Sequence, residues 1–246
     1  RIMDRCGFRI DEWFFEIDAT VKAGILFPGW GKGDYVDVWH PFLFGEIPDL
    51  DTTQYNLWSK HQHYDFKKYG LTFYDCSIEH NSIDVTTLKG YAFHIDAGKL
   101  VTFIQKKLKD RSRVKFISSE VVDIQRDNAN NISFLGLKNG EKVKADLYVD
   151  CTGFKQLLAF EPERVDLYGR LFCDTAIAAH VPYENKIEEM NCYVVSEQVE
   201  HGWVWNIPVQ SRIGSGLVFN RSCTDIEEAK DFFCQYWNNR ISKENL

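Results

Sequence analysis

The hydrophobic positions of the chain follow two periods, which together predict a mixed fold. From Leu100 to Leu108 the apolar residues recur at the spacing of one helix face, and Asp96 precedes them in the position of an N-cap. After this helix, short apolar runs predict strands at 114–117, 121–124, 132–137, 142–144 and 147–151. The run at 147–151 is apolar enough for a buried strand. This order of elements predicts an α/β (α+β) fold with mixed sheets and helices.

The first part of the chain gives shorter patterns. Residues 10–17 have a helical pattern, and residues 20–27 have a strand pattern that includes Lys22. A loop rich in Gly and Pro follows at 28–33. Residues 45–90 give mixed signals: the pattern at 49–68 favours a helix, and that at 77–87 a polar loop.

The segment Gly202–Pro208 reads G-W-V-W-N-I-P and places two tryptophans two positions apart. In an extended segment such residues project from the same face, so Trp203 and Trp205 form one aromatic surface. Pro208 stops the ladder because proline has no N–H to donate. Two readings remain open from these residues alone: a core strand with large side chains, or a wall of defined shape beside a ligand.

Composition narrows the function classes. Aromatic residues make up 15 % of the 246 residues, which suits a pocket for a planar ligand. A net charge of -7 argues against nucleic-acid binding, which depends on a positive surface. No apolar stretch reaches the roughly 20 residues that span a bilayer, so no membrane association is expected. The start at Arg1 shows neither a signal peptide nor an initiator Met, which suggests a fragment.

The seven cysteines form no C-x-x-C pair. Their odd number fits neither a complete disulfide framework nor a zinc knuckle, so a reducing, cytoplasmic location and no metal are expected. One other metal pattern exists, the H-x-H-x-D of His61, His63 and Asp65, which resembles the start of metallo-hydrolase sites. Phe66 stands where that motif has His, and this weakens the metal reading.

Three segments resemble the signatures of flavin-dependent halogenases, and they occur in the order of that family. They are G-Y-A-F-H-I-D-A at 90–97, V-D-C-T-G-F at 149–154, and W-x-W-x-I-P at 203–208. The resemblance, to the tryptophan-type members, extends from about Phe8 to Trp237. It implies a FAD-binding fold of the glutathione-reductase and hydroxylase type.

The resemblance also implies a division of the chain by role. Residues 1–90 would be a substrate-side segment with the catalytic lysine, 91–155 part of the FAD-binding domain, and 156–246 the substrate-domain sheet and its following helix. The family's G-x-G-x-x-G has no match near the start, and its later L-E-x-x-E-S-T-G-like element has none after Asn245. We therefore expect an internal portion of a longer enzyme, incomplete at both ends, that exposes apolar surface.

By the same resemblance, Lys22 takes the position of the catalytic lysine. His40 and Phe42 match the segment that sandwiches the aromatic substrate. The implied wall between flavin and substrate consists of Trp203, Trp205, Ile207 and Pro208. The implied cofactor contacts are Val122, Asp150, Thr152 and Gly153.

The implied reaction is electrophilic halogenation of an indole-like aromatic compound, with tryptophan as one candidate. Reduced FAD, O2 and a halide generate hypohalous acid, which Lys22 relays to the substrate, and a separate flavin reductase supplies the reduced flavin. A homodimer is possible. Two alternatives stay open: a FAD-dependent aromatic monooxygenase and a non-catalytic module that binds an aromatic ligand. The substrate, the ring position and the halide do not follow from the sequence.

Overall fold

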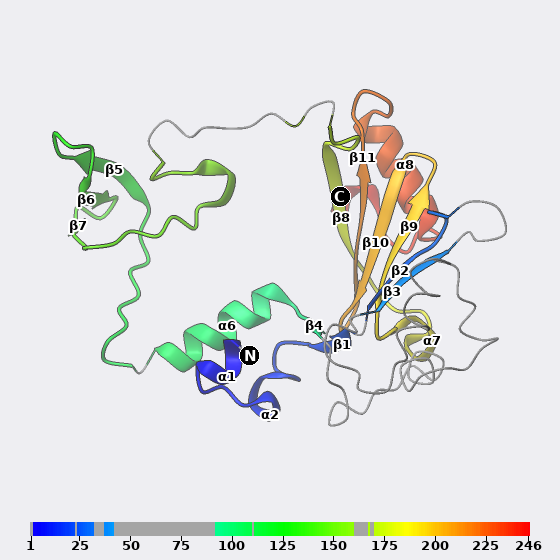
Figure 1. Ribbon diagram of the computed structural model, residues 1–246, viewed down its shortest axis with the longest axis horizontal. Coiled ribbons are helices and arrows are strands. Elements are labelled where there is room, and N and C mark those ends of the chain that lie inside the picture. Colours follow the sequence, from blue (N-terminus) through cyan, green and yellow to red (C-terminus); the bar gives the residue numbers. More distant parts are fainter. Residues whose placement is uncertain are drawn as a thin grey trace, which may run out of the picture. The chain divides into compact units, whose positions relative to one another are not determined.

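A computed structural model describes residues 2–22, 24–31, 37–41, 92–109, 111–159, 167 and 170–246 (Figure 1). Two compact units make up the chain: unit 1 comprises residues 1–105 and 168–246, and unit 2 comprises residues 106–167. The metal pattern at His61 lies outside the described residues, as does the segment 45–90. The predicted division by role into three segments stays a prediction.

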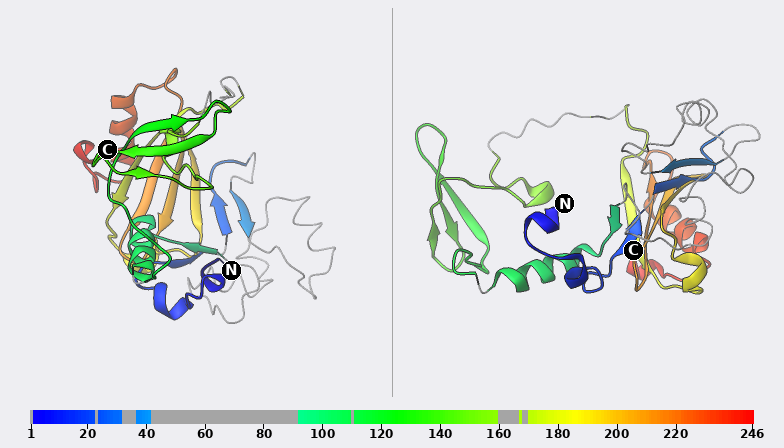
Figure 2. Two further views of the ribbon diagram at one scale, coloured as in Figure 1. Left: turned by 90° about the vertical axis from the view of Figure 1, so that its left-hand side faces the viewer. Right: turned by 60° about the horizontal axis from the view of Figure 1, so that its bottom comes forward.

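Unit 1 is built on a six-stranded sheet with the order β3-β2-β9-β10-β11-β8 (Figure 2). Its strands are β2 (Gly24–Phe27), β3 (Val38–Pro41), β8 (Thr175–Val181), β9 (Val194–Val199), β10 (Gly202–Pro208) and β11 (Ile213–Phe219). Neighbouring strands are antiparallel except for β2 and β9, which run parallel. The parallel pair joins an N-terminal strand to the C-terminal part of the chain, so residues far apart in sequence share one sheet.

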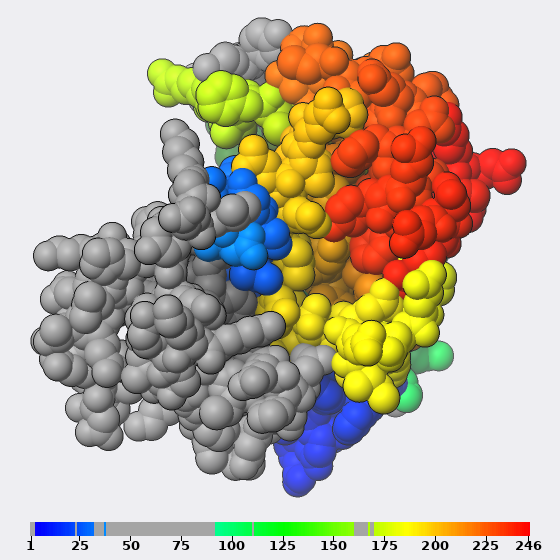
Figure 3. Space-filling model, turned by 90° about the vertical axis from the view of Figure 1, so that its right-hand side faces the viewer, coloured from blue at the N-terminus to red at the C-terminus, as the bar shows by residue number. Residues whose placement is uncertain are grey.

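The two faces of this sheet differ because side chains alternate along each strand. On one face, Val204 of β10 packs with Leu217 and Phe233 in the main core cluster, which includes helix α8 (Ile226–Tyr236). Asp225 caps α8 by accepting hydrogen bonds from the backbone N–H groups of residues 227 and 228. Figure 3 shows α8, in red, beside the yellow and orange strands. Trp203 projects from the opposite face to Val204, as the sequence pattern predicts.

The rest of unit 1 is a small helical layer with its own core. Helices α1 (Ile2–Arg5), α2 (Ile10–Trp13) and α6 (Ala97–Leu108) enclose a second cluster, in which Phe103 is fully buried. The predicted helix at 97–108 is confirmed, and Asp96 caps it by accepting from the Lys99 backbone N–H at 3.0 Å. The short strands β1 (Thr20–Lys22) and β4 (Ala92–His94) pair beside this layer.

Two expectations for the N-terminal part are corrected. The helix predicted over 10–17 ends at Trp13, and turns follow until Asp18, which has a positive φ of 61°. The single strand predicted over 20–27 is divided into β1 and β2, which belong to different sheets. The hydrophobic pattern is continuous across both strands, so it does not reveal that their pairing partners differ.

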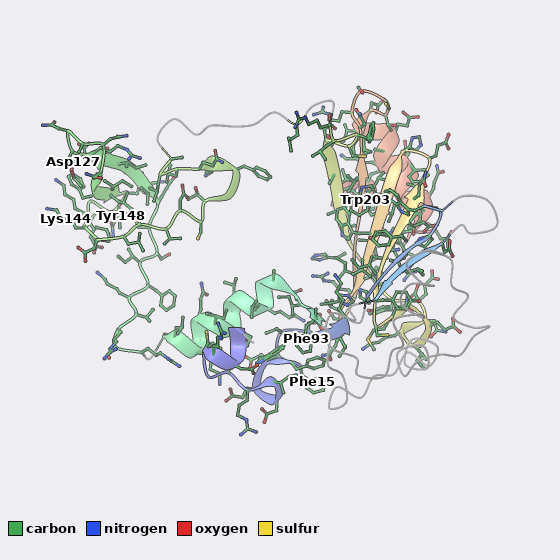
Figure 4. The ribbon with its side chains drawn as sticks, in the orientation of Figure 1. Phe15, Phe93, Asp127, Lys144, Tyr148 and Trp203 are labelled. Carbon is green, nitrogen blue, oxygen red and sulfur yellow. The ribbon has the colours of Figure 1, made fainter. Side chains whose placement is uncertain are left out.

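Unit 2 contains the predicted meander, formed by β5 (Val121–Arg126), β6 (Ile132–Leu137) and β7 (Lys142–Val143). Asp127, labelled in Figure 4, closes the β5–β6 turn by accepting from the backbone N–H groups of residues 129 and 131, both at 2.9 Å. Two strand predictions are wrong in this unit: residues 114–117 and 147–151 are not in strands.

The segment 147–151 shows why its prediction fails. Leu147 and Val149 are 78 % and 74 % exposed. A buried strand needs hydrogen-bonded neighbours and a covering layer, and none of the strands in the described part of unit 2 pairs with this segment. Its apolar side chains are therefore exposed to solvent, in agreement with the expectation that the chain exposes apolar surface.

Candidate active site

Lys22 is the last residue of β1 and lies opposite Ala92 of β4. Thr20, two residues earlier, projects from the same face, and His94 lies opposite Thr20. The other face carries Phe93, labelled in Figure 4. Its ring packs edge-on against Trp13, with ring centroids 5.1 Å apart. The ribbon formed by β1 and β4 therefore has one apolar face in the helical layer and one polar face with the lysine. Burial lowers the pKa of Lys22 from its ordinary value.

A hydrogen-bonded chain connects this polar face to the end of β10. The Thr20 hydroxyl donates to the backbone carbonyl of Pro208 at 2.6 Å, and Thr20 Oγ1 lies 2.9 Å from Nδ1 of His94. Pro208 closes the W-x-W-x-I-P segment, so its carbonyl anchors the tryptophan strand to the strand that carries Lys22. The sequence predicts that Pro208 is part of the wall. The structure shows in addition that its main-chain carbonyl accepts a hydrogen bond from Thr20.

His94 is buried, with 3 % of its surface exposed. Burial is the largest cause that lowers its pKa to about 4, and the positive charge of Lys22 lowers it further. The imidazole is therefore neutral at physiological pH. His94 belongs to the G-Y-A-F-H-I-D-A segment but was not among the predicted site residues. The signal that could have identified it is its place in a short strand, on the face opposite Phe93.

A charged cluster fixes the turn that follows β10. Arg212 Nη2 lies 2.7 Å from Asp96 Oδ2, and Lys99 Nζ lies 3.3 Å from Asp18 Oδ2. The Ser211 hydroxyl also donates to Asp18 at 2.5 Å. The Lys99 backbone N–H, and then Arg212, hold the pKa of Asp96 below its usual range. These contacts attach the start of α6, and Asp18 two residues before β1, to the β10–β11 turn, next to Pro208.

Trp203 and Trp205 are half-buried on the same face of β10. Their ring centroids are 6.0 Å apart with an angle of 56° between the ring planes. Gly216 of β11 lies directly opposite Trp205, and a Cβ there would overlap the indole ring. The glycine therefore lets the indole lie against the backbone of β11. Figure 4 labels Trp203 on this sheet.

The other face of β10 is held by a partly buried polar network. The Trp237 indole N–H donates to Ser215 Oγ at 3.0 Å, and that hydroxyl donates to Asn206 Oδ1 at 2.7 Å. Asn206 donates through Nδ2 to Tyr236 at 3.1 Å, and Tyr236 donates to Glu197 at 2.5 Å. Burial and the bond to Glu197 raise the pKa of Tyr236. Asn206 lies between Trp205 and Ile207, so α8 fixes the strand from behind while Trp203, Trp205 and Ile207 face the other way.

The segment Phe27–Trp30, from the end of β2 through the turn that follows it, lies at the neighbouring edge of this surface. The Trp30 indole N–H donates to the Ser196 carbonyl at 2.9 Å, and the rings of Phe27 and Trp30 meet edge-on at 6.3 Å. Ser196 lies opposite Trp205 in the ladder between β9 and β10. Aromatic side chains from both ends of the chain therefore surround the same stretch of β9.

The predicted substrate residues are only partly described. His40 is part of β3, where it pairs with Ile25 of β2. This pairing places His40 in the same sheet as Trp203 and Trp205. Phe42 lies outside the described residues, so its predicted role is a prediction only.

In unit 2, three of the four predicted cofactor residues meet in one loop. Asp150 accepts from the Thr152 hydroxyl at 2.6 Å, the Thr152 N–H at 2.9 Å and the Leu158 N–H at 2.7 Å. These bonds, the first above all, hold the pKa of Asp150 below its usual range. Gly153 has a φ of 62°, and a Cβ there would meet no atom within 4 Å. A ligand group could therefore approach the backbone closely.

A shallow pocket lies in this loop and is lined by Asp150, Cys151, Gly153, Gln156, Leu158 and Ala159. The fourth predicted cofactor residue, Val122, is exposed on β5. A carboxylate that closes a turn beside an open glycine fits a cofactor that contacts the protein through the main chain. Among the described residues, no group of three or more His, Cys, Asp or Glu could hold a metal ion. No described helix is both long and apolar enough to cross a membrane.

The lysine on β1, the W-x-W-x-I-P strand and the D-C-T-G loop are the features in which this chain resembles the class of flavin-dependent halogenases. The family model described as tryptophan halogenase matches residues 2–245. The chain belongs to the tryptophan halogenase family.

Individual relatives agree with this assignment. The tryptophan 6-halogenase ThaL of Streptomyces albogriseolus is 28 % identical over 258 residues, which cover 95 % of this chain and 48 % of the relative. The crystal structure of the tryptophan 6-halogenase SttH from Streptomyces toxytricini has a TM-score of 0.80 at 27 % identity, covering 95 % of this chain and 49 % of that one.

The structure of Tar14, a tryptophan C-6 flavin-dependent halogenase, supports the fold with a TM-score of 0.78 at 24 % identity. That match covers 95 % of this chain and 49 % of that one. The chain thus spans about half the length of the curated relatives it matches. The predicted fold class, a mixed α/β fold of the kind that binds FAD in these halogenases, is confirmed.

Proposed function

We propose that the protein containing this chain is a FAD-dependent halogenase that acts on an indole-like aromatic substrate. The observation that carries the proposal is the attachment of the lysine strand to the tryptophan strand, through Thr20 and the Pro208 carbonyl. The attachment holds a half-buried amine and the end of an aromatic wall in one unit. Such a pair suits the delivery of a reactive electrophile to a defined point.

Lys22 is the delivery group in this proposal. When bound, reduced FAD would activate O2, which then oxidises a halide ion to hypohalous acid. Lys22 then acts in one of two ways: its ammonium donates a hydrogen bond to hypohalous acid, or its free amine reacts to give a haloamine and water. The second route requires a neutral amine, and the lowered pKa of Lys22 favours it.

Trp203 and Trp205 form the wall that keeps substrate from the flavin, with Ile207 and Pro208 continuing it. The packing of Trp205 over Gly216, and the network behind Asn206, support a wall of fixed shape. A fixed wall suppresses direct hydroxylation because the substrate cannot reach the flavin.

His40 and Phe42 would sandwich the aromatic ring and so select the carbon that faces Lys22. Asp150, Thr152 and Gly153 would hold the cofactor, with Val122 as a further contact. The relatives' names specify tryptophan halogenation at position 6 or 7, which favours an indole as the substrate here. A separate flavin reductase would supply reduced flavin by diffusion, and the cysteine content favours the cytoplasm.

The test is an assay of the full-length protein with FAD, a flavin reductase, NADH and each halide in turn. Tryptophan, other indoles and phenols are screened by mass spectrometry. Halide-dependent product that is lost in Lys22→Met supports the proposal. Hydroxylated product that does not depend on halide would support the aromatic monooxygenase instead, and ligand binding with no flavin and no turnover would support a binding module.

A further inference from the structure

The hydrogen bonds around His94 determine which of its nitrogens carries the proton. The Thr20 hydroxyl has one hydrogen, and it donates this hydrogen to the Pro208 carbonyl, which can only accept. Thr20 Oγ1 is therefore an acceptor toward Nδ1 of His94, 2.9 Å away. Nδ1 must carry the N–H. A neutral imidazole has only one N–H, so Nε2 is left with a lone pair.

That lone pair is buried without a partner. His94 is 3 % exposed, and Nε2 accepts no hydrogen bond from any residue that the structure describes. A buried acceptor without a donor costs free energy comparable to a lost hydrogen bond. Such a group is expected where a donor arrives during function.

In the pairing of β1 with β4, Lys22 is the side-chain donor that lies diagonally across from His94. It lies on the same face of the ribbon as Thr20, opposite Ala92, so Lys22 and His94 are diagonal neighbours across two strands. Diagonal neighbours are within reach when one side chain is long. Ala92, opposite Lys22, has only a methyl group as its side chain. The charge of Lys22 already acts on the imidazole.

We propose that His94 is a positioning residue for Lys22: in solution the amino group of Lys22 turns toward His94 and donates one hydrogen bond to the Nε2 lone pair, which has no partner among the residues described in this structure. This proposal deepens the proposed function and rests on it, since it assigns the group that aims the delivering lysine. With one N–H bound to Nε2, the direction of the remaining donors, or of the amine lone pair, is fixed. The Thr20–Pro208 connection then sets that direction relative to the tryptophan strand.

The first test is nitrogen NMR on the full-length protein labelled with ¹⁵N-histidine. His94→Asn assigns the signals, because the Asn amide can still donate to Thr20 while it removes the Nε2 acceptor. We expect a protonated Nδ1 and a non-protonated Nε2. In Lys22→Met, a side chain of similar length with no donor, the Nε2 signal should move toward that of a free acceptor while Nδ1 stays unchanged. A protonated Nε2, or no change in Lys22→Met, would overturn the proposal.

The second test measures how the full-length enzyme distributes its oxidant. His94→Asn should lower halogenated product per flavin oxidised by about 10-fold or more, the usual effect of one lost hydrogen bond to a charged group. The hypohalous acid captured by an added scavenger should rise correspondingly. A merely structural role would lower both together. His180→Asn, at an exposed position on β8, is the matched control and should change neither.

The double variant separates the two proposals. His94→Asn should have no further effect in a Lys22→Met background, because His94 acts through the lysine. If Lys22→Met keeps its product, the lysine relay itself fails. If Lys22→Met loses product and His94→Asn does not, only the positioning role fails.

Discussion

Acidification should destabilise unit 1 through His94 alone by a measurable amount. Burial lowers the pKa of His94 from 6.5 to about 4 in the folded chain. The unfolded chain therefore binds a proton at a higher pH than the folded chain does. The stability associated with the neutral imidazole is complete above about pH 6.5 and is lost progressively as the pH falls to about 4.

The magnitude follows from the two pKa values. At about 1.4 kcal/mol for each tenfold change, the lowering from 6.5 to about 4 amounts to roughly 3 kcal/mol in full. Between about pH 7 and about pH 5 the loss should be about 2 kcal/mol, because protonation of the folded state has barely begun.

The assay is denaturant unfolding followed by tryptophan fluorescence at a series of pH values. All seven tryptophans lie in residues 1–58 and 203–237, so this signal reports unit 1. His94→Asn is the comparison because it keeps a donor toward Thr20 but does not titrate. The free energy of unfolding of the two proteins should differ by about 2 kcal/mol more at pH 7 than at pH 5. Parallel pH dependences would refute the assignment of a buried, neutral His94.

Three further changes test separate parts of the structure. Gly216→Ala should displace the Trp205 indole and destabilise unit 1 by about 1–3 kcal/mol, seen as a lower denaturation midpoint with altered fluorescence; an unchanged spectrum and midpoint would contradict the packing. Asp225→Ala should cost about 1 kcal/mol by removing the α8 cap, and Asp225→Asn should restore much of it; equal losses in both would exclude a capping role. Thr152→Val should raise the pKa of Asp150 in a carbon NMR titration, and an unchanged pKa would show that the hydroxyl is not its main partner.

The elements that sequence predicted correctly are those specified by local patterns. The helix from Ala97 to Leu108 has an apolar stripe and a cap within its own residues, so no distant partner is needed to recognise it. The placement of Trp203 and Trp205 on one face also follows from the period of a strand. The meander of unit 2 consists of strands adjacent in sequence with short turns.

The elements that were missed depend on distant partners. The division of 20–27 into two strands depends on β4 and β9, which lie more than sixty residues further along the chain. The apolar run at 147–151 reads as a buried strand, yet burial requires neighbours that the run itself does not specify.

The site was predictable only in part for the same reason. Lys22 and the tryptophan pair were found through their resemblance to a family. The role proposed for His94 rests on its contact with Thr20, and residues 74 positions apart reveal no pairing in a single sequence. The hydrogen bond to the Pro208 carbonyl could not be predicted either, because every residue has a main-chain carbonyl and the sequence does not show which one is used.

The most direct measurement of the central claim compares the full-length enzyme with its Lys22→Met variant under FAD, flavin reductase, NADH and halide. Both proteins should oxidise reduced flavin and bind FAD equally, because the substitution leaves the predicted cofactor residues Asp150, Thr152 and Gly153 unchanged. The account predicts halogenated aromatic product from the first and none detectable from the second, by mass spectrometry. Equal halogenation by both proteins would contradict it.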